Sequence, residues 1–341
     1  MRWTALLLIA ALAGCAHGAP SNRQDVALMS WTHGFIDEVG IPTEGDLQYV
    51  KGSLMLPHHL GSGRVPAVVM LHSGVGQGSQ DWFYARLLNE WGIAVLAIDS
   101  FSPRNVKNTV GDQSLVSEGS ILADAFAGLN YLSEHPNIDA NRIAAMGFSK
   151  GATPTLLAGL TRYRDRLAHG DNRFAAHVGY YPWCGFAFIN HKTTGSPILV
   201  MSGENDLVTP ADLCEKLVER WALSNPDTDI EMITYPDAGH AFEYPHPFLE
   251  MVGDLPVYGE LPRDCFIAET EPEVFTEMRS RIRIRGNTLR SALDLCATWS
   301  HKAYVQFSEP AQIDSRERLR AFMQRTLLTR PHQQATVGSS Q

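Results

Sequence analysis

The sequence predicts an α/β protein whose mostly parallel, doubly wound sheet is flanked by helices. Short and nearly continuous apolar runs recur along the chain, and such runs are typical of strands buried on both faces of a parallel sheet. Segments with helical periodicity separate these runs, and this alternation predicts a doubly wound fold. In one place a Gly-x-Ser-x-Gly pentapeptide joins an apolar run to a helical segment, as a strand–turn–helix unit requires.

These runs lie within residues 46–330, which we expect to form one domain between a peripheral N-terminal extension over 15–45 and a flexible tail over 331–341. Strands are expected over 47–56 (antiparallel), 65–71, 93–98, 142–147, 177–181, 198–202 and 230–235. Helices are expected over 81–91, 117–135, 151–160 and 211–222.

The composition is that of an ordinary globular protein. Of 341 residues, 44% are apolar, and 37 acidic against 28 basic residues give a net charge of −9. These values exclude a disordered or collagen-like chain. Because the chain is acidic and has no basic block, we expect no nucleic-acid partner.

The N-terminus has the pattern of an export signal over residues 1–14, with a basic residue, a short apolar core and a small-residue site. Leu12-Ala13-Gly14-Cys15 resembles the lipobox of bacterial lipoproteins, which implies cleavage before Cys15 and acylation of that residue. Ala16 after the cysteine favours the outer membrane in that family. We therefore expect an outer-membrane lipoprotein facing the periplasm, and the alternative is an ordinary signal that yields a soluble periplasmic protein.

The pentapeptide Gly147–Gly151 predicts a nucleophile elbow with Ser149 at its centre. The turn is tight, so Cβ atoms at the glycine positions would clash, and the serine is held in a strained backbone conformation. The amide of Lys150 then lies at a helix N-terminus and is a candidate oxyanion donor.

A serine hydroxyl needs a base that is oriented by an acid, and in this fold the chain order is Ser, Asp or Glu, His. Asp206 follows the strand over 198–202, and His240 follows the strand over 230–235. The predicted triad is therefore Ser149, Asp206 and His240. Glu204 and Asp237 are the competing acids.

The second oxyanion donor is expected in the loop that follows the strand over 65–71. Its glycines let the backbone approach a substrate closely. We expect the Gly74 amide to be the donor, with the Val75 amide as the alternative, and we expect His72 to be a structural residue of the loop.

Together these features resemble the dienelactone hydrolase family. The resemblance rests on LHSGVG, DSFSPR, GFSKG, SGENDLVTP and GHAF, and it covers about residues 45–243 and a final helix around 316–327. It implies the α/β-hydrolase fold. Dienelactone hydrolase itself uses a Cys nucleophile where this chain has Ser149, and it has a Glu near the oxyanion loop where this chain has Ser73. These departures favour a general esterase over a lactone-specific enzyme.

The resemblance also draws attention to Arg104. In the family, an arginine on the loop after the strand that ends at Asp99 can bind a substrate carboxylate, and Arg104 occupies that place. The alternative is that Arg104 is a structural ion-pair partner within the loop.

Residues 243–302 form a longer excursion than the family requires between its histidine and its last helix. The excursion is either a lid or pocket wall beside His240 or a packed surface extension. Its basic run over 279–285 alternates Arg with Ile, which predicts a half-exposed strand.

Four cysteines remain besides Cys15, and an exported protein with four cysteines is expected to form disulfides. We expect the pairs Cys184–Cys214 and Cys265–Cys296, because each joins cysteines that are nearest in sequence. Four free buried thiols are the alternative. The spacings do not resemble a zinc site, and we expect no metal or cofactor.

The leading functional prediction is a serine hydrolase that cleaves small-molecule esters, or lactones, through an acyl-enzyme. A peptidase of the prolyl-oligopeptidase type has the same fold and triad order, but about 50 mature residues before the core cannot build the N-terminal propeller usual in that group. A non-catalytic envelope binding protein is the third hypothesis, which the full set of triad residues disfavours.

Overall fold

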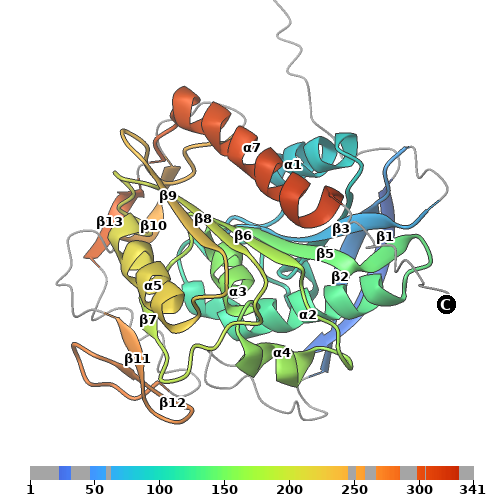
Figure 1. Ribbon diagram of the computed structural model, residues 1–341. Coiled ribbons are helices and arrows are strands. Elements are labelled where there is room, and N and C mark those ends of the chain that lie inside the picture. The colour runs from blue at the N-terminus through green and yellow to red at the C-terminus, as the bar shows by residue number, and fades with distance from the viewer. Residues whose placement is uncertain are drawn as a thin grey trace, which may run out of the picture.

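An eight-stranded mixed sheet organises the computed structural model, which describes residues 23–31, 47–58, 63–244, 251–257, 266–284, 298–303 and 305–329 (Figure 1). The strand order is β1-β2-β4-β3-β5-β6-β8-β9. Neighbouring strands from β4 to β9 run parallel, whereas β1 and β2 pair antiparallel and β2 joins β4 antiparallel. The predicted doubly wound α/β fold is confirmed.

The elements follow the expected order. The main sheet consists of β1 (Arg23–Trp31), β2 (Leu47–Met55), β3 (Val65–Leu71), β4 (Ala94–Asp99), β5 (Ile138–Phe148), β6 (Ala176–Tyr180), β8 (Ile198–Gly203) and β9 (Ile230–Tyr235). The helices are α1 (Ser79–Glu90), α2 (Glu118–Glu134), α3 (Ala152–Leu157), α4 (Thr161–Leu167), α5 (Ala211–Ser224) and α7 (Glu309–Met323). Two small sheets contain β7 (Phe186–Ala187), β10 (Met251–Val257), β11 (Ile267–Glu271), β12 (Val274–Glu277) and β13 (Thr298–Ala303).

Helices cover both faces of the sheet, which explains why its central strands are apolar throughout. Helices α1 and α7 lie on one face (Figure 1). Tyr84 and Phe322 of these helices belong to the same buried cluster as Met146 of β5. Helices α2, α3 and α5 lie on the other face, where Leu129 and Leu156 pack against the strands. With both faces buried, a strand gains nothing from a polar position, so its sequence reads as a continuous apolar run.

Strand β1 was not anticipated, because residues 15–45 were expected to be peripheral. It forms the edge of the main sheet, and it pairs with β2 from Arg23 opposite Met55 to Trp31 opposite Leu47. Leu28 and Ser30 are buried. An edge strand covered on one face carries a mixed sequence, so its apolar pattern is weak.

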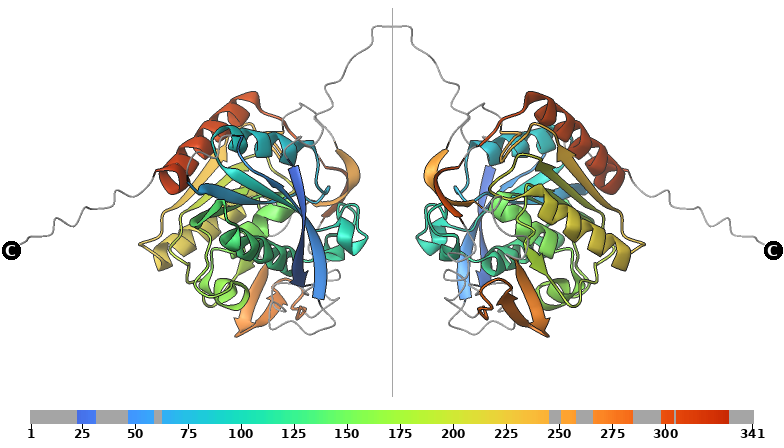
Figure 2. Two further views of the ribbon diagram at one scale, coloured as in Figure 1. Left: turned by 90° about the vertical axis from the view of Figure 1, so that its right-hand side faces the viewer. Right: turned by 90° about the vertical axis from the view of Figure 1, so that its left-hand side faces the viewer.

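The part of the excursion over 266–284 is a packed surface extension. Strand β11 pairs with β12 and with β7, and this small sheet lies on the far side of the molecule from α7 (Figure 2). Ile267, Phe275 and Ile284 are buried in the core there. The described part of the basic run, 279–284, does not form the expected strand: residues 278–280 are a turn, Arg281 has a φ of +62°, and only an isolated bridge joins Arg283 to Thr276.

A disulfide joins Cys184, which follows β6, to Cys214 on α5. This is one of the two pairs that the sequence predicts. Cys265 and Cys296 lie outside the described residues, as do the predicted signal and Cys15. In the described part of the chain, no helix combines the length and apolar character that a membrane span needs.

Candidate active site

Ser149 lies at the carboxyl end of β5, in the tight turn that the pentapeptide predicts. Its φ is +49°, a left-handed conformation that is costly for a residue with a side chain. A Cβ at Gly147 would collide with the Gly151 carbonyl, and a Cβ at Gly151 would come within 2.5 Å of the His72 carbonyl oxygen. Both glycines are therefore required, and the turn aims the serine away from the sheet.

Three side chains from separate loops form one hydrogen-bonded relay. The Ser149 Oγ lies 2.9 Å from His240 Nε2, and His240 Nδ1 lies 2.8 Å from Asp206 Oδ2. The structure thus brings together the three residues that the sequence proposed for a triad. The competing acids Glu204 and Asp237 are both exposed and take no part in the relay.

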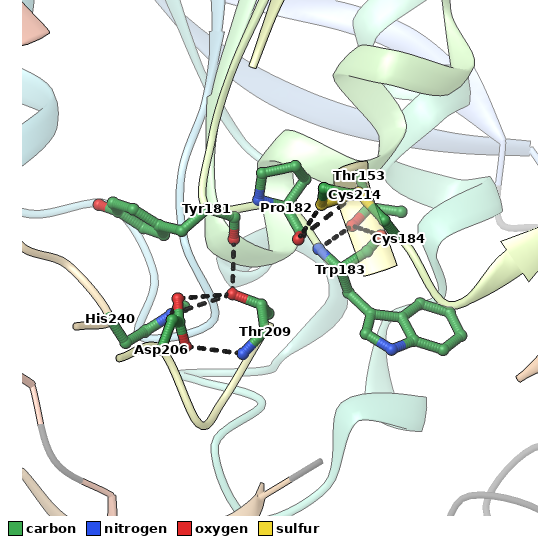
Figure 3. The surroundings of a disulfide bond; sticks show 9 residues. All are labelled: Thr153, Tyr181, Pro182, Trp183, Cys184, Asp206, Thr209, Cys214 and His240. Carbon is green, nitrogen blue, oxygen red and sulfur yellow. Dashed lines mark hydrogen bonds and ion pairs between the residues drawn. A yellow bond between two sulfur atoms is a disulfide. The ribbon is translucent and has the colours of Figure 1, made fainter. Parts of the chain in front are cut away.

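The Asp206 carboxylate is fully enclosed by donors. Its Oδ1 accepts the amides of Val208 and Thr209, each at 2.8 Å. The Thr209 Oγ1 lies 2.9 Å from Asp206 Oδ2 and 3.0 Å from the Tyr181 carbonyl oxygen, so it joins the acid to the segment after β6 (Figure 3). These hydrogen bonds fix the position of the carboxylate, which in turn holds the His240 imidazole in one orientation.

The disulfide lies directly behind this arrangement. In Figure 3, Thr209 contacts the Tyr181 carbonyl on one side of Pro182, and the disulfide between Cys184 and Cys214 lies on the other side. The bond therefore ties the Tyr181 segment to the helix that follows the Asp206 loop.

A cavity of about 70 Å³ opens next to Ser149 and His240. Gly74 and Val75, the two candidates for the second oxyanion donor, both line it. Lys150 follows the serine, and its ammonium donates to the Gln113 carbonyl at 2.8 Å and pairs with a Glu118 carboxylate oxygen at 3.0 Å. The lysine side chain is thus structural, which leaves only its amide as a candidate donor.

The sequence left two roles open for Arg104, substrate binding and a structural ion pair, and the structure shows an ion pair. Its guanidinium makes a two-pronged pair with Asp124, at 2.8 and 2.9 Å, and also donates to the Ser100 carbonyl. The Arg104 side chain is 6% exposed and that of Asp124 is completely buried. The geometry favours this alternative over the expected substrate-binding role, because the two-pronged edge of the guanidinium that would hold a substrate carboxylate is occupied by Asp124.

A buried carboxyl group lies behind His240. Glu243 accepts the Gln80 side-chain amide at 2.6 Å and the Tyr181 hydroxyl at 3.1 Å, and the Tyr181 ring meets the His240 imidazole edge-on at 4.7 Å. Burial raises the pKa of Glu243 to about 7, although its hydrogen bonds and the nearby His240 act in the opposite direction.

Sequence reasoning missed Thr209, Tyr181, Gln80 and Glu243. Thr209 has a detectable signal, since an Asp followed three residues later by a Thr is a common local hydrogen-bonding pattern. Tyr181 and Gln80 have no local signal, because their roles depend on how distant strands and helices pack.

Residues 50–251 match the family model described as the dienelactone hydrolase family. A protein of Mycobacterium tuberculosis H37Rv described as uncharacterized is 30% identical over 203 residues, which is 55% of this chain and 67% of that protein. A Bradyrhizobium protein named as a probable 2-oxo-3-(5-oxofuran-2-ylidene)propanoate lactonase is 25% identical over 217 residues, which is 61% of this chain and 84% of that one.

Two solved structures are similar to this chain. A putative dienelactone hydrolase from Klebsiella pneumoniae has 21% identity and a TM-score of 0.46, covering 65% of this chain and 89% of its own. An esterase from Thermogutta terrifontis has 14% identity and a TM-score of 0.44, covering 57% of this chain and 79% of its own.

Proposed function

Because this chain belongs to the dienelactone hydrolase family, we propose that it is a serine hydrolase that cleaves carboxylic esters through an acyl-enzyme. The observation that carries the proposal is the continuous relay from the Ser149 hydroxyl through His240 to Asp206, with hydrogen bonds of 2.9 and 2.8 Å. A cavity that could hold part of a substrate adjoins the hydroxyl.

In the first half of the reaction, Ser149 Oγ attacks the ester carbonyl while His240 Nε2 accepts its proton. Asp206 stabilises the imidazolium that forms. The amides of Gly74 and Lys150 are proposed to hold the developing oxyanion, and each such donor contributes about 2.7–4 kcal/mol to the transition state. The tetrahedral intermediate collapses, and the imidazolium returns the proton to the departing alcohol.

In the second half, a water molecule replaces the alcohol. His240 accepts a proton from that water as it attacks the acyl-serine carbonyl, and the second tetrahedral intermediate breaks down to release the acid and the free hydroxyl. The imidazolium then returns this proton to Ser149 Oγ, so the same base serves both halves of the reaction.

The test is hydrolysis of 4-nitrophenyl acetate together with labelling by a fluorophosphonate probe. We expect Ser149→Ala to reduce turnover to near the buffer background, a loss of at least about 10⁴-fold, and to abolish labelling. Ser133→Ala, near the end of α2, is the matched control and should retain both. Full activity in Ser149→Ala would end the proposal.

A lactone is a second candidate substrate, because the Bradyrhizobium relative is named as a probable lactonase. Ring opening uses the same attack, with the alcohol remaining attached to the acyl group. A panel of neutral five- and six-membered lactones, compared with linear esters of equal carbon number, would rank the two classes by kcat/KM.

We further propose that the protein is exported and anchored to the outer membrane through a lipid on Cys15. The lipobox-like sequence supports this location. Cells fed a radiolabelled fatty acid should label the wild type and not Cys15→Ser. Equal labelling of both proteins would contradict the anchor, and a soluble, unlabelled periplasmic form would favour an ordinary signal.

A further inference from the structure

The cavity beside Ser149 is small. Its volume is about 70 Å³, whereas an apolar protein cavity of about 150 Å³ accommodates a benzene ring. The space therefore suits a fragment of about two to four heavy atoms. Apolar side chains form much of its wall, including those of Val110, Val208, Ala241 and Val305.

The cavity wall is also uncharged. Among the described residues that line it there is no Asp, Glu, Lys or Arg, and the polar members Gln80 and Gln113 are neutral amides. Two basic residues of the sequence motifs, Arg104 and Lys150, each form an ion pair with an acidic side chain. Arg104 is paired with Asp124, and Lys150 is paired with Glu118.

Further contacts stabilise the ion pair between Arg104 and Asp124. Asp124 also accepts the hydroxyl of Ser30 at 2.5 Å, so its carboxylate is held from β1 as well as from the loop. Releasing Arg104 toward a ligand would leave the Asp124 charge buried without its partner, which is strongly unfavourable. A carboxylate-bearing substrate would therefore enter a cavity whose described lining residues include no Lys or Arg.

Hydrogen bonds hold the wall in place from three sides. The Tyr244 hydroxyl lies 2.8 Å from Ser79 Oγ at the start of α1, and the Thr109 amide donates to the Gly74 carbonyl at 2.7 Å. The Lys150 ammonium holds the Gln113 carbonyl. These links make the cavity a pre-formed shape rather than one that opens for a larger group.

From these observations we propose that the site hydrolyses esters whose acyl group is short, apolar and uncharged, with Val110 and Val305 limiting its length. This inference rests on the proposed esterase function and names the substrate class for it. It predicts discrimination against both long acyl chains and acyl groups that carry a carboxylate.

The experiment measures kcat/KM for four 4-nitrophenyl esters: acetate, butyrate, octanoate and the anionic hemisuccinate. We expect acetate and butyrate to be at least about tenfold better than octanoate, and butyrate to be at least about tenfold better than hemisuccinate, which has a similar length. Val110→Ala and Val305→Ala should each raise the octanoate-to-acetate ratio several-fold. Val274→Ala, on the remote strand β12, removes the same two methyl groups and should leave the ratio unchanged.

A second arm uses Arg104→Met. If Arg104 is structural, this variant lowers the melting temperature but keeps the hemisuccinate-to-butyrate ratio of the wild type. A selective loss on hemisuccinate, or a wild type that prefers hemisuccinate or octanoate to butyrate, would overturn the inference. Absence of turnover on all four esters together with no fluorophosphonate labelling of Ser149 would instead overturn the proposed function.

Discussion

At the scale of single residues, the site depends on how completely one carboxylate is surrounded. Asp206 accepts two amides, an imidazole N–H and the Thr209 hydroxyl, while being almost fully buried. Buried charged groups are tolerated when every lone pair has a donor. Residues of its own loop therefore hold the Asp206 carboxylate in place independently of His240.

Thr209→Val tests this support. The substitution keeps the shape and the backbone amide but removes the hydroxyl that lies 2.9 Å from Asp206 and 3.2 Å from His240 Nδ1. We expect kcat on 4-nitrophenyl acetate to fall by about tenfold, since one hydrogen bond to a charged group contributes about 1.5–3 kcal/mol. Asp206→Asn should cost far more, about 10⁴-fold. A Thr209→Val enzyme with unchanged kcat would show that the amides alone position the acid.

Glu243 provides a prediction about pH. Its pKa is about 7 in the folded protein, above the ordinary value of 4.5, so the folded state binds the proton more tightly than the unfolded state. The stability from this group is complete below about pH 4.5 and is lost as the pH rises to about 7. Between pH 5 and pH 8 the free energy of unfolding should fall by an amount on the order of 2 kcal/mol more in the wild type than in Glu243→Gln.

Urea unfolding of both proteins at several pH values is the measurement. The buried His177 acts in the opposite direction, because burial lowers its pKa to about 4 and its stabilisation is lost as the pH falls below 6.5. Both proteins contain His177, so its effect cancels in the difference. Parallel pH curves for the wild type and Glu243→Gln would contradict the assignment.

At the scale of elements, the disulfide connects two loops that hold the relay. Cys184 follows the Tyr181 segment, Cys214 lies in the first turns of α5, and the Asp206 loop lies between the two cysteines in the chain. The bond closes a loop over a sequence separation of 30 residues. It therefore restrains the unfolded chain and braces the acid in the folded one.

Replacing both cysteines, as Cys184→Ala with Cys214→Ala, should lower the free energy of unfolding by about 2–4 kcal/mol. We expect the activity of the folded variant to fall by a few-fold as well. Urea unfolding and initial rates at a temperature well below the transition separate the two effects. Wild-type protein treated with dithiothreitol should match the variant, and unchanged stability in both samples would show that the bond is dispensable.

The elements that the sequence predicts well are those buried on both faces. The runs over 65–71, 93–98 and 198–202 correspond closely to β3, β4 and β8. The elements that it misses are one-sided or short: β1 lies at the sheet edge, and α4 has seven residues. The final helix begins at Glu309, before the expected 316, because its first turns are polar and have a weak apolar period.

The same division applies to the site. Ser149, Asp206 and His240 each lie in a recognisable motif just after a strand, so the sequence alone was enough to predict that they form one site. Arg104 was ambiguous because its partner Asp124 lies 20 residues away on α2, and no motif links the two. An ion pair between side chains on different elements depends on how those elements pack, and sequence periodicity does not predict that packing.

At the scale of the whole molecule, the N-terminal strand is coupled to the neighbourhood of the active site. Ser30 of β1 binds Asp124, and Asp124 binds Arg104 on the loop that precedes the cavity wall. Residues at the beginning and the middle of the domain thus share one buried polar cluster. Strand β1 should therefore be an integral part of the domain.

A chain that begins at residue 46 tests this coupling against one that begins at residue 23. The shorter chain loses the burial of Leu28, which contributes about 1.5–3 kcal/mol, and leaves Asp124 without one donor. We expect it to be less stable than the longer chain by about 3 kcal/mol or more, measured by urea unfolding. Equal stability of the two chains would mean that β1 is dispensable to the domain.

The distances along the chain within the relay have a consequence for biosynthesis. Ser149 leaves the ribosome 91 residues before His240, and Asp206 precedes that histidine by 34. Until β9 docks beside β8, the nascent polypeptide holds an ordinary alcohol with no base to activate it. The relay therefore cannot form until the chain has been synthesised through His240 and β9 has paired with β8, so Ser149 lacks its base before that point.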